Sequence, residues 1–334
     1  MSANHNGSLE AAQRILRAAA EYGADAIKLQ TFTPATLTID SHRPEFFIDD
    51  ASSLWHGRRL WDLYEEAHTP WEWHQPIFEL ARKEGLACIS SAFDIGSIRF
   101  LSSLGVDAIK IASHELIHIP LIEEAARSGK PVLLSAGMAS IEELDEAVGV
   151  LRGNGCEQFI LLKCTSAYPA DEADANVLTI TEMRTRCGCQ VGLSDHTIHP
   201  YVAFAATALG ACVIEKHFTM ARADGGLDAA FSIEPLELRE LATGTEMVWK
   251  SLGKVSFGAL GVEEASVKER PSIYVVRSMK EGEKFTEQNL RIIRPSAGLA
   301  PKHYRGLIGK TCACDITAET PMSWDMVLNG AAIE

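Results

Sequence analysis

The amino-acid sequence predicts an α/β protein, a (β/α)8 TIM barrel followed by a small second domain. Short apolar runs alternate with amphipathic stretches from residue 23 to about residue 250, the pattern of parallel βα units. Two segments also repeat each other, residues 23–30 (GADAIKLQ) and 105–112 (GVDAIKIA). Each ends a helix, enters a strand and places a lysine near the carboxyl end of that strand, which indicates a repeated unit.

The apolar runs predict seven strands, at residues 25–31, 86–92, 107–113, 131–137, 158–164, 190–195 and 212–218. Helices are expected between them, and the clearest are residues 8–22, 140–151 and 235–252. Ser140 and Glu143 have the spacing of a capping box. Because a complete barrel has eight strands and this sequence opens on a polar loop and a helix, we expect the first strand to lie before Met1.

Residues 33–69 are too long for an ordinary βα turn, so we expect an elaborated loop over the barrel mouth. For its tryptophans, Trp55 and Trp61, packing of the insertion is favoured over stacking on a substrate. The barrel domain is expected at residues 1–252. Residues 253–271 lack periodicity and predict a linker. Short strands at 272–276 and 289–294 then indicate a compact domain over residues 272–334.

The composition is that of an ordinary globular protein, with 46% hydrophobic and 23% charged residues in 334. A net charge of −14 argues against a nucleic-acid partner or an anionic membrane surface. The sequence contains no apolar run of the roughly 20 residues that a membrane helix needs, and no signal segment at its start. We therefore expect a cytoplasmic protein whose eight cysteines are reduced.

Two apolar stretches run directly into a histidine, residues 192–197 (GLSDHT) and 214–219 (IEKHFT). They place His196 and His217 at the tips of successive strands. Neighbouring strands lie about 4.8 Å apart, so two such imidazoles can share one metal ion. A metal with open positions would polarise a carbonyl group. The alternative is a pair of satisfied structural histidines.

Active sites of these barrels lie at the carboxyl ends of the strands. The polar residues expected there are Lys28, Gln30, Ser90, Ser91, Lys110, Ser113, Glu115, Ser135, Thr165, Ser166, Tyr168, Ser194, Asp195, Glu215 and Lys216. Two lysines with a ring of hydroxyl groups suit a phosphate ester, and a phosphate beside a polarised carbonyl suggests carbon–carbon bond chemistry. A structural salt bridge of the lysines, or a lysine that forms an imine as in some aldolases, remains an alternative.

The sequence resembles the sialic acid synthase family, the phosphoenolpyruvate-dependent nonulosonate synthases. The motifs that carry this resemblance are residues 4–8 (NHNGS), 28–30 (KLQ), 110–113 (KIAS), 135–137 (SAG), 163–169 (KCTSAYP), the two histidine segments and 225–228 (GGLD). Within the family, residues 68–74 (HTPWEWH), 163–169 and 224–235 look most like the pseudaminic acid synthases. The small domain is similar to the antifreeze-like (SAF) domains of the family.

The resemblance implies a transferase that condenses phosphoenolpyruvate with 2,4-diacetamido-2,4,6-trideoxy-L-altrose to give pseudaminic acid and phosphate. An N-acetylneuraminate or legionaminate synthase and an inactive, truncated family member are the alternatives. The family pattern also places a catalytic glutamate on a strand before Met1. A domain-swapped homodimer and a divalent metal ion, Mn²⁺ with Mg²⁺ or Co²⁺ as alternatives, are implied as well.

The resemblance implies a role for individual residues. His196 and His217 would hold the metal, and Lys110 and Glu115 would act in catalysis beside them. The residues implied to bind phosphoenolpyruvate are Lys28, Lys110, Ser91, Ser113, Ser135 and Ser194. Those implied to line the sugar or the pyruvyl side are Glu115, Ser166, Tyr168 and Asp228, with Arg294 reaching the sugar from the partner subunit. Gln30 is also expected to bind substrate.

Overall fold

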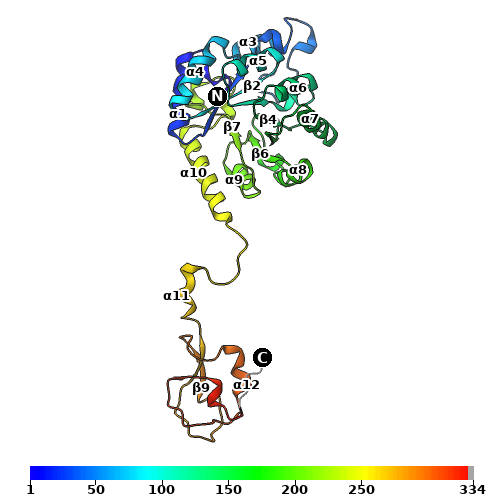
Figure 1. The fold of residues 1–334 in the computed structure, drawn as a ribbon. Helices are drawn as coiled ribbons and strands as arrows, with labels where there is room; N and C mark the ends of the chain where they lie inside the picture. Colours follow the sequence, from blue (N-terminus) through cyan, green and yellow to red (C-terminus); the bar gives the residue numbers. More distant parts are fainter. Residues whose placement is uncertain (330–334) are drawn as a thin grey trace. The chain divides into compact units, whose positions relative to one another are not determined.

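The structure is a computed structural model that describes residues 1–329. The chain divides into two compact units, Met1–Gly253 and Lys254–Glu334, which run from blue to yellow and from yellow to red in Figure 1. The last five residues of the expected small domain, 330–334, lie outside the described residues.

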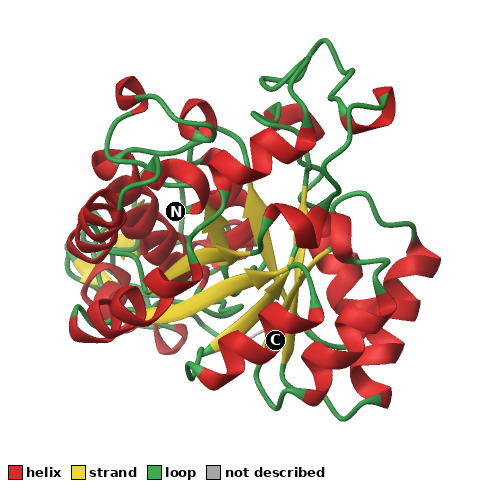
Figure 2. Cartoon of the chain, turned by 90° about the horizontal axis from the view of Figure 1, so that it is seen from above, coloured by secondary structure: helices red, strands yellow, loops and turns green. Residues whose placement is uncertain are grey.

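The first unit contains a seven-stranded parallel sheet whose strands follow chain order. The strands are β1 (Ala26–Thr31), β2 (Ala87–Ala92), β3 (Ala108–Ile111), β4 (Val132–Ser135), β5 (Phe159–Cys164), β6 (Gln190–Asp195) and β7 (Ile214–Lys216). The sheet curls, and helices cover its outer face (Figure 2). The expected barrel architecture is confirmed as a curled half-barrel, and all seven expected strands are present. β6 has the expected bounds, the others are shorter, and β7 is reduced to three residues.

Eight longer helices pack on the outside of this sheet: α1 (Leu9–Glu21), α4 (His74–Lys83), α5 (Ile95–Ser103), α6 (Ile119–Arg127), α7 (Ile141–Gly153), α8 (Thr179–Cys187), α9 (Tyr201–Ala208) and α10 (Pro235–Leu252). Ser8 caps α1 by accepting a hydrogen bond from the Ala11 backbone. The capping box of Ser140 and Glu143 starts α7 as expected. The apolar faces of these helices meet the outward strand residues in one continuous core.

Alternation along β1 separates this core from the inner face. In β1, Ile27 and Leu29 are buried in the core, while Lys28 and Gln30 alternate with them and are only partly buried. A strand places successive side chains on opposite faces, so the two polar residues of β1 point into the barrel. Parallel pairing sets Gln30 opposite Ser91 of β2.

The insertion after β1 contains α2 (Pro34–Leu37), the 3-10 turn η2 (Pro44–Phe46) and α3 (Leu60–Ala67). A further 3-10 turn, η3 (Trp71–Trp73), precedes α4. Helix α4 begins only at His74, because the backbone of Trp73 first bonds back to Pro70 in a tighter turn. The Trp71 ring stacks on Phe100 at 4.5 Å between centroids.

The start of the chain differs from the expected polar loop. Residues Ser2–His5 form a buried 3-10 turn, η1, and His5 is fully buried. The Asn4 side chain donates to the Phe218 carbonyl (2.9 Å) and to Ser232 Oγ (2.8 Å). Polar side chains can be buried when they are hydrogen-bonded, so a polar composition did not exclude a buried turn here.

The second unit has its own three-stranded antiparallel sheet in the order β10 (Thr320–Pro321), β8 (Ser272–Val275), β9 (Leu290–Ile293). Two short helices, α11 (Glu264–Val267) and α12 (Tyr304–Leu307), accompany it. Its separate core includes Ile273, Phe285 and Met322. Across the described part of both units, no helix is long and apolar enough to cross a membrane.

Candidate active site

The two histidines expected at the strand tips lie side by side. Their ring centroids are 5.3 Å apart, just beyond the ends of β6 and β7. His196 Nδ1 is 2.8 Å from the Thr165 carbonyl, which can only accept, so Nδ1 carries the proton and Nε2 keeps a free lone pair. His217 Nδ1 is 3.0 Å from Ser2 Oγ. Burial lowers the pKa of His217 well below its ordinary value, so this ring is neutral at pH 7.

These features fit a divalent metal ion. Imidazoles bind metals in the neutral form, and a ring whose other nitrogen is hydrogen-bonded is held in the orientation that a ligand needs. Among residues 1–329, no group of three or more His, Cys, Asp or Glu side chains is arranged to hold a metal. His196 and His217 would therefore leave several coordination positions to substrate or water.

A buried ion pair joins the two strand ends that carry these histidines. Lys216 Nζ lies 2.7 Å from Asp195 Oδ2 and donates to the Thr197 carbonyl at 2.6 Å. Asp195 Oδ1 also accepts from the backbone and hydroxyl of Thr197. Both charged side chains are almost fully buried. Loss of one would leave the other as a buried charge without a partner of opposite sign, which is strongly destabilising. The pair thus fixes the backbone next to each histidine.

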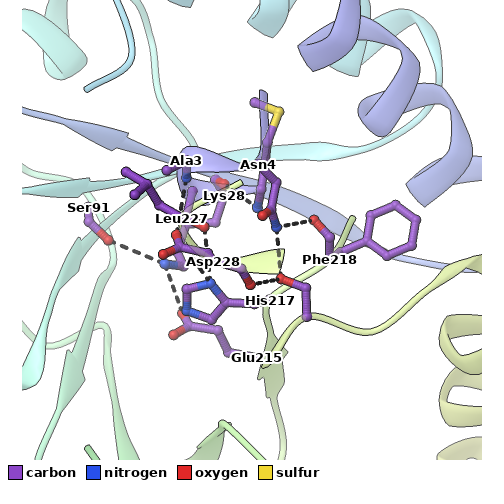
Figure 3. A network of polar contacts seen from close by, with 12 residues as sticks. Ala3, Asn4, Lys28, Ser91, Glu215, His217, Phe218, Leu227 and Asp228 are labelled. Carbon is purple, nitrogen blue, oxygen red and sulfur yellow. Dashed lines mark hydrogen bonds and ion pairs between the residues drawn. The ribbon is translucent and has the colours of Figure 1, made fainter. Parts of the chain in front are cut away.

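A second cluster centres on Glu215 of β7, which forms ion pairs with two inward lysines, Lys28 and Lys110. Figure 3 shows Glu215 with Lys28 and Ser91. The Glu215 carboxylate oxygens are 3.9 Å from Lys28 Nζ and 3.6 Å from Lys110 Nζ. Ser194 Oγ donates to Glu215 at 2.7 Å. Burial alone would raise the pKa of Glu215, but Lys110 and Lys28 outweigh it and lower that pKa to about 2.

The two lysines therefore form the salt bridges that were considered as the alternative to a ligand site. Their ammonium groups nevertheless retain N–H donors for a further ligand. Both ion-pair distances exceed those of a hydrogen bond. Lys28 donates to Ser91 Oγ at 3.4 Å, and Lys110 donates to its neighbour's backbone carbonyl at 3.3 Å. Two cations around one carboxylate leave a net positive charge in a buried place. This arrangement suits a further anion.

Serine hydroxyl groups surround the next two strand ends. The Gly137 backbone donates to Ser113 Oγ at 3.2 Å. A Cβ atom on Gly137 would lie 2.8 Å from that oxygen and would overlap Ser166 Oγ, so only glycine allows these hydroxyl groups to approach. Ser135 Oγ is buried and has no hydrogen-bond partner among the described residues. A buried hydroxyl without a partner is costly, and a bound ligand would supply one.

Glu115 lies in the 3-10 turn η4 (Ser113–Glu115) after β3. Its Oε2 atom is buried without a partner in the described structure. Burial raises the pKa of this carboxyl to about 6, against the opposing effects of a backbone hydrogen bond and of Lys110. A carboxyl group that titrates near neutral pH is suited to proton transfer.

Aromatic rings and Asp228 also adjoin the histidine pair. The Tyr168 ring is 4.4 Å from that of His196, and the Phe231 ring is 4.8 Å from that of His217. Asp228 Oδ2 lies 3.8 Å from His217 Nδ1 and accepts a hydrogen bond from the Ala3 backbone (Figure 3).

The structure thus brings most of the expected residues together in two adjoining groups. Lys28, Lys110, Ser91 and Ser194 gather at Glu215, while Tyr168 and Asp228 adjoin the histidines. Arg294 belongs to the second unit, directly before the cis bond to Pro295.

Sequence reasoning gave no role to three residues of this site. Glu215 appeared only as one polar strand end among many, although two inward lysines already required an acid or an anion nearby. Phe231 belongs to a segment noted only for its resemblance. Ser2 carried no signal, because the expected loop had no reason to contact His217.

The comparison with known families agrees with this geometry. Residues 15–257 match the NeuB family, and residues 270–328 match the SAF domain. The chain belongs to the NeuB family. Among NeuB-family relatives, the pseudaminic acid synthase of Helicobacter pylori is 39% identical over 97% of this chain and 95% of its own length. That of Campylobacter jejuni is 40% identical over 95% of this chain and 92% of its own length.

A solved structure of a sialic acid synthetase has a similar fold to this chain. The crystal structure of an N-acetylneuraminic acid synthetase from Leptospira borgpetersenii superposes with a TM-score of 0.70 at 32% identity. The match covers 79% of this chain and 87% of that one. The family resemblance, the enzyme class of synthase and the SAF assignment of the small domain, all inferred from sequence motifs, are confirmed.

Proposed function

We propose that this chain condenses phosphoenolpyruvate with 2,4-diacetamido-2,4,6-trideoxy-L-altrose to give pseudaminic acid and phosphate. The observation that carries the proposal is the direct adjacency of a buried two-lysine cluster to a pair of histidines at neighbouring strand tips. The first suits an anionic phosphate ester, and the second suits a metal that activates an aldehyde. The similarity to two proteins named pseudaminic acid synthase favours this sugar.

Phosphoenolpyruvate would bind at the lysine cluster. Lys28 and Lys110 have the charge and the free donors to hold its phosphate and carboxylate groups. The serine hydroxyl groups would complete this site, and Ser135 Oγ would gain the partner that it lacks among the described residues. Gln30 projects from the same face of β1 as Lys28 and would contact the substrate beside it.

His196 and His217 would hold the divalent metal ion, which we propose to be Mn²⁺, with Mg²⁺ or Co²⁺ as alternatives. When bound, such an ion polarises the carbonyl of the sugar aldehyde. Tyr168 and Asp228, which adjoin the two rings, would orient the sugar.

The reaction joins carbon 3 of phosphoenolpyruvate to carbon 1 of the aldehyde. Water adds at carbon 2, and the carbon–oxygen bond to phosphate then breaks, which yields a nine-carbon 2-keto acid. The new alkoxide needs a proton and the attacking water must lose one. Glu115, with its pKa near 6, is the described carboxyl best suited to exchange these protons.

We further propose that the protein acts as a domain-swapped homodimer, in which Arg294 of the SAF unit reaches the sugar bound by the partner subunit. A guanidinium group can hold sugar oxygens with several donors at once.

Phosphate release tests the proposed function. It should require phosphoenolpyruvate, the diacetamido sugar and Mn²⁺ together, and N-acetylmannosamine should replace the sugar poorly. Better turnover of N-acetylmannosamine would assign the chain to neuraminate synthesis. Inactivation by borohydride would indicate an imine at a lysine. Sugar binding without any phosphate release would mean an inactive family member.

A further inference from the structure

An aromatic cluster adjoins the histidine pair, and its outermost member comes from the insertion after β1. The cluster consists of Trp55, Tyr168 and Phe231. The Trp55 ring lies 6.0 Å from Tyr168 and 6.2 Å from Phe231 between centroids. The latter two rings lie 5.2 Å apart and each adjoins a histidine. Three segments far apart in the sequence therefore meet here.

A hydrogen bond from the indole nitrogen and the conformation of the surrounding loop hold Trp55 in this position. Its Nε1 donates to the Leu227 carbonyl at 3.2 Å, one residue before Asp228. The flanking backbone forms a closed turn, in which the Gly57 N–H donates to the Ile48 carbonyl and the Ile48 N–H to that of Arg58. The neighbours Leu54 and His56 are exposed, whereas Trp55 is half-buried. The insertion thus directs one side chain towards the site.

Two chemically different groups adjoin the histidine pair. One consists of Glu215 and its two lysines, and the other consists of the three aromatic rings. In the proposed reaction phosphoenolpyruvate binds at the charged group, which leaves the aromatic group for the sugar. The aldehyde carbon lies at the histidines, which brings the acetamido group on the adjacent carbon 2 closest to the rings. The methyl and planar amide of that group pack well on aromatic faces.

We propose that Trp55 is a specificity-determining residue, which forms with Tyr168 and Phe231 the wall that receives the carbon 2 acetamido group of the sugar. This inference rests on the proposed function of the same site. Trp55 is the outer part of the wall and keeps Tyr168 in place against His196. Its hydrogen bond and ring neighbours are Leu227, Tyr168 and Phe231, which are not part of the lysine cluster.

Steady-state kinetics of Trp55→Ala and Trp55→Phe test the proposal. The probes are the diacetamido sugar and its analogue with a hydroxyl group in place of the carbon 2 acetamido group. Loss of one apolar contact changes discrimination by about 10-fold or more. We expect Trp55→Ala to lower kcat/KM for the diacetamido sugar by at least about 10-fold and to lower the preference over the analogue by a similar factor. The KM for phosphoenolpyruvate should stay within about twofold of wild type, and Trp55→Phe, which keeps an aromatic ring, should lose less.

Trp249→Ala provides a matched control, because Trp249 is an exposed tryptophan of α10 (66% exposed). It should leave the sugar preference unchanged. Equal losses of kcat/KM for both sugars, or a rise in the KM for phosphoenolpyruvate that matches the sugar effect, would overturn the assignment. If wild type releases no phosphate with either sugar, the proposed function fails, and calorimetric titration with the diacetamido sugar then decides the role of Trp55. If wild type and Trp55→Ala then bind the diacetamido sugar with equal affinity, the proposed role of Trp55 is wrong.

Discussion

Nζ of Lys110 lies 3.6 Å from Oε1 of Glu215, although the two residues belong to β3 and β7 and are more than 100 positions apart in the chain. Lys110 is 3% exposed and Glu215 16% exposed, so solvent screens their attraction only weakly. The same carboxylate also faces Lys28. Burial lowers the pKa of Lys110, and the charge of the Glu215 carboxylate opposes this shift.

Replacement of Lys110 should weaken phosphoenolpyruvate binding specifically. Lys110→Met keeps most of the aliphatic volume and removes the charge. A hydrogen bond to a charged group contributes about 1.5–3 kcal/mol, so we expect the KM for phosphoenolpyruvate to rise by about 10-fold or more. Lys250→Met, on the exposed face of α10, is the control. An effect confined to the KM for the sugar would show that the two substrates are placed the wrong way round.

Replacement of either histidine should remove metal-dependent turnover. His196→Ala or His217→Ala deletes one of the two proposed ligands, while the Asp195–Lys216 pair that holds the strand ends remains. We expect phosphate release at saturating Mn²⁺ to fall below a few per cent of wild type, with a melting temperature close to that of His199→Ala. His199 is an exposed residue of the same loop and serves as the control. Substantial activity in either variant would exclude the metal assignment.

Mixed dimers test whether the SAF unit acts on the partner subunit. An Arg294→Ala chain lacks the proposed sugar contact but keeps its histidines, and a His217→Ala chain has the opposite defect. After the two proteins are unfolded together and refolded, heterodimers should hold one intact composite site and recover up to about a quarter of wild-type phosphate release. That fraction follows from random pairing, in which half of the dimers are mixed and each has one of two sites intact. Recovery no greater than in the separate proteins would place Arg294 over its own barrel or outside the reaction.

The strands and the candidate site differ in how far the sequence could predict them. Apolar runs between turn signals predicted all seven strands, because the strands of a parallel sheet are covered on both faces and read as short, nearly continuous apolar runs. His196 and Lys110 were found because polar residues at the ends of such strands have few structural uses. Glu215 and Phe231 were not assigned, since their roles come from partners that only folding brings near. No local pattern shows which of several acids will face a given lysine.

The η1 turn illustrates the same limit. Residues 2–5 are small or polar and have no helical periodicity, and a loop was the reasonable expectation. Their burial depends on distant partners, since Asn4 bonds to the Phe218 carbonyl and Ser2 to His217. Hydrogen bonds across more than 200 residues leave no trace in the spacing of the sequence.

A buried histidine outside the site should make the stability of the fold depend on pH. His74 at the start of α4 is fully buried, with Nε2 2.7 Å from Thr31 Oγ1 and Nδ1 3.2 Å from the Pro70 carbonyl. Burial lowers the pKa of His74 to about 4, whereas the unfolded chain titrates near 6.5. Between about pH 6.5 and pH 4, His74 is therefore protonated in the unfolded state but not in the folded state. Stability should fall as the pH falls from about 6.5 to about 4.

Urea unfolding at pH 7 and pH 5 measures this effect. When the pH falls from 7 to 5, a pKa shift of that size should lower the free energy of unfolding of the wild type by about 2 kcal/mol from His74 alone. His74→Gln cannot take up the proton in either state, so its loss of stability over the same interval should be smaller by about that amount, whatever its stability at pH 7. His199→Gln, which replaces an exposed histidine, is the control and should keep the wild-type difference. His5, whose pKa burial also lowers to about 4, should maintain part of the dependence in His74→Gln. An unchanged difference in His74→Gln would show that this imidazole becomes protonated within the folded protein.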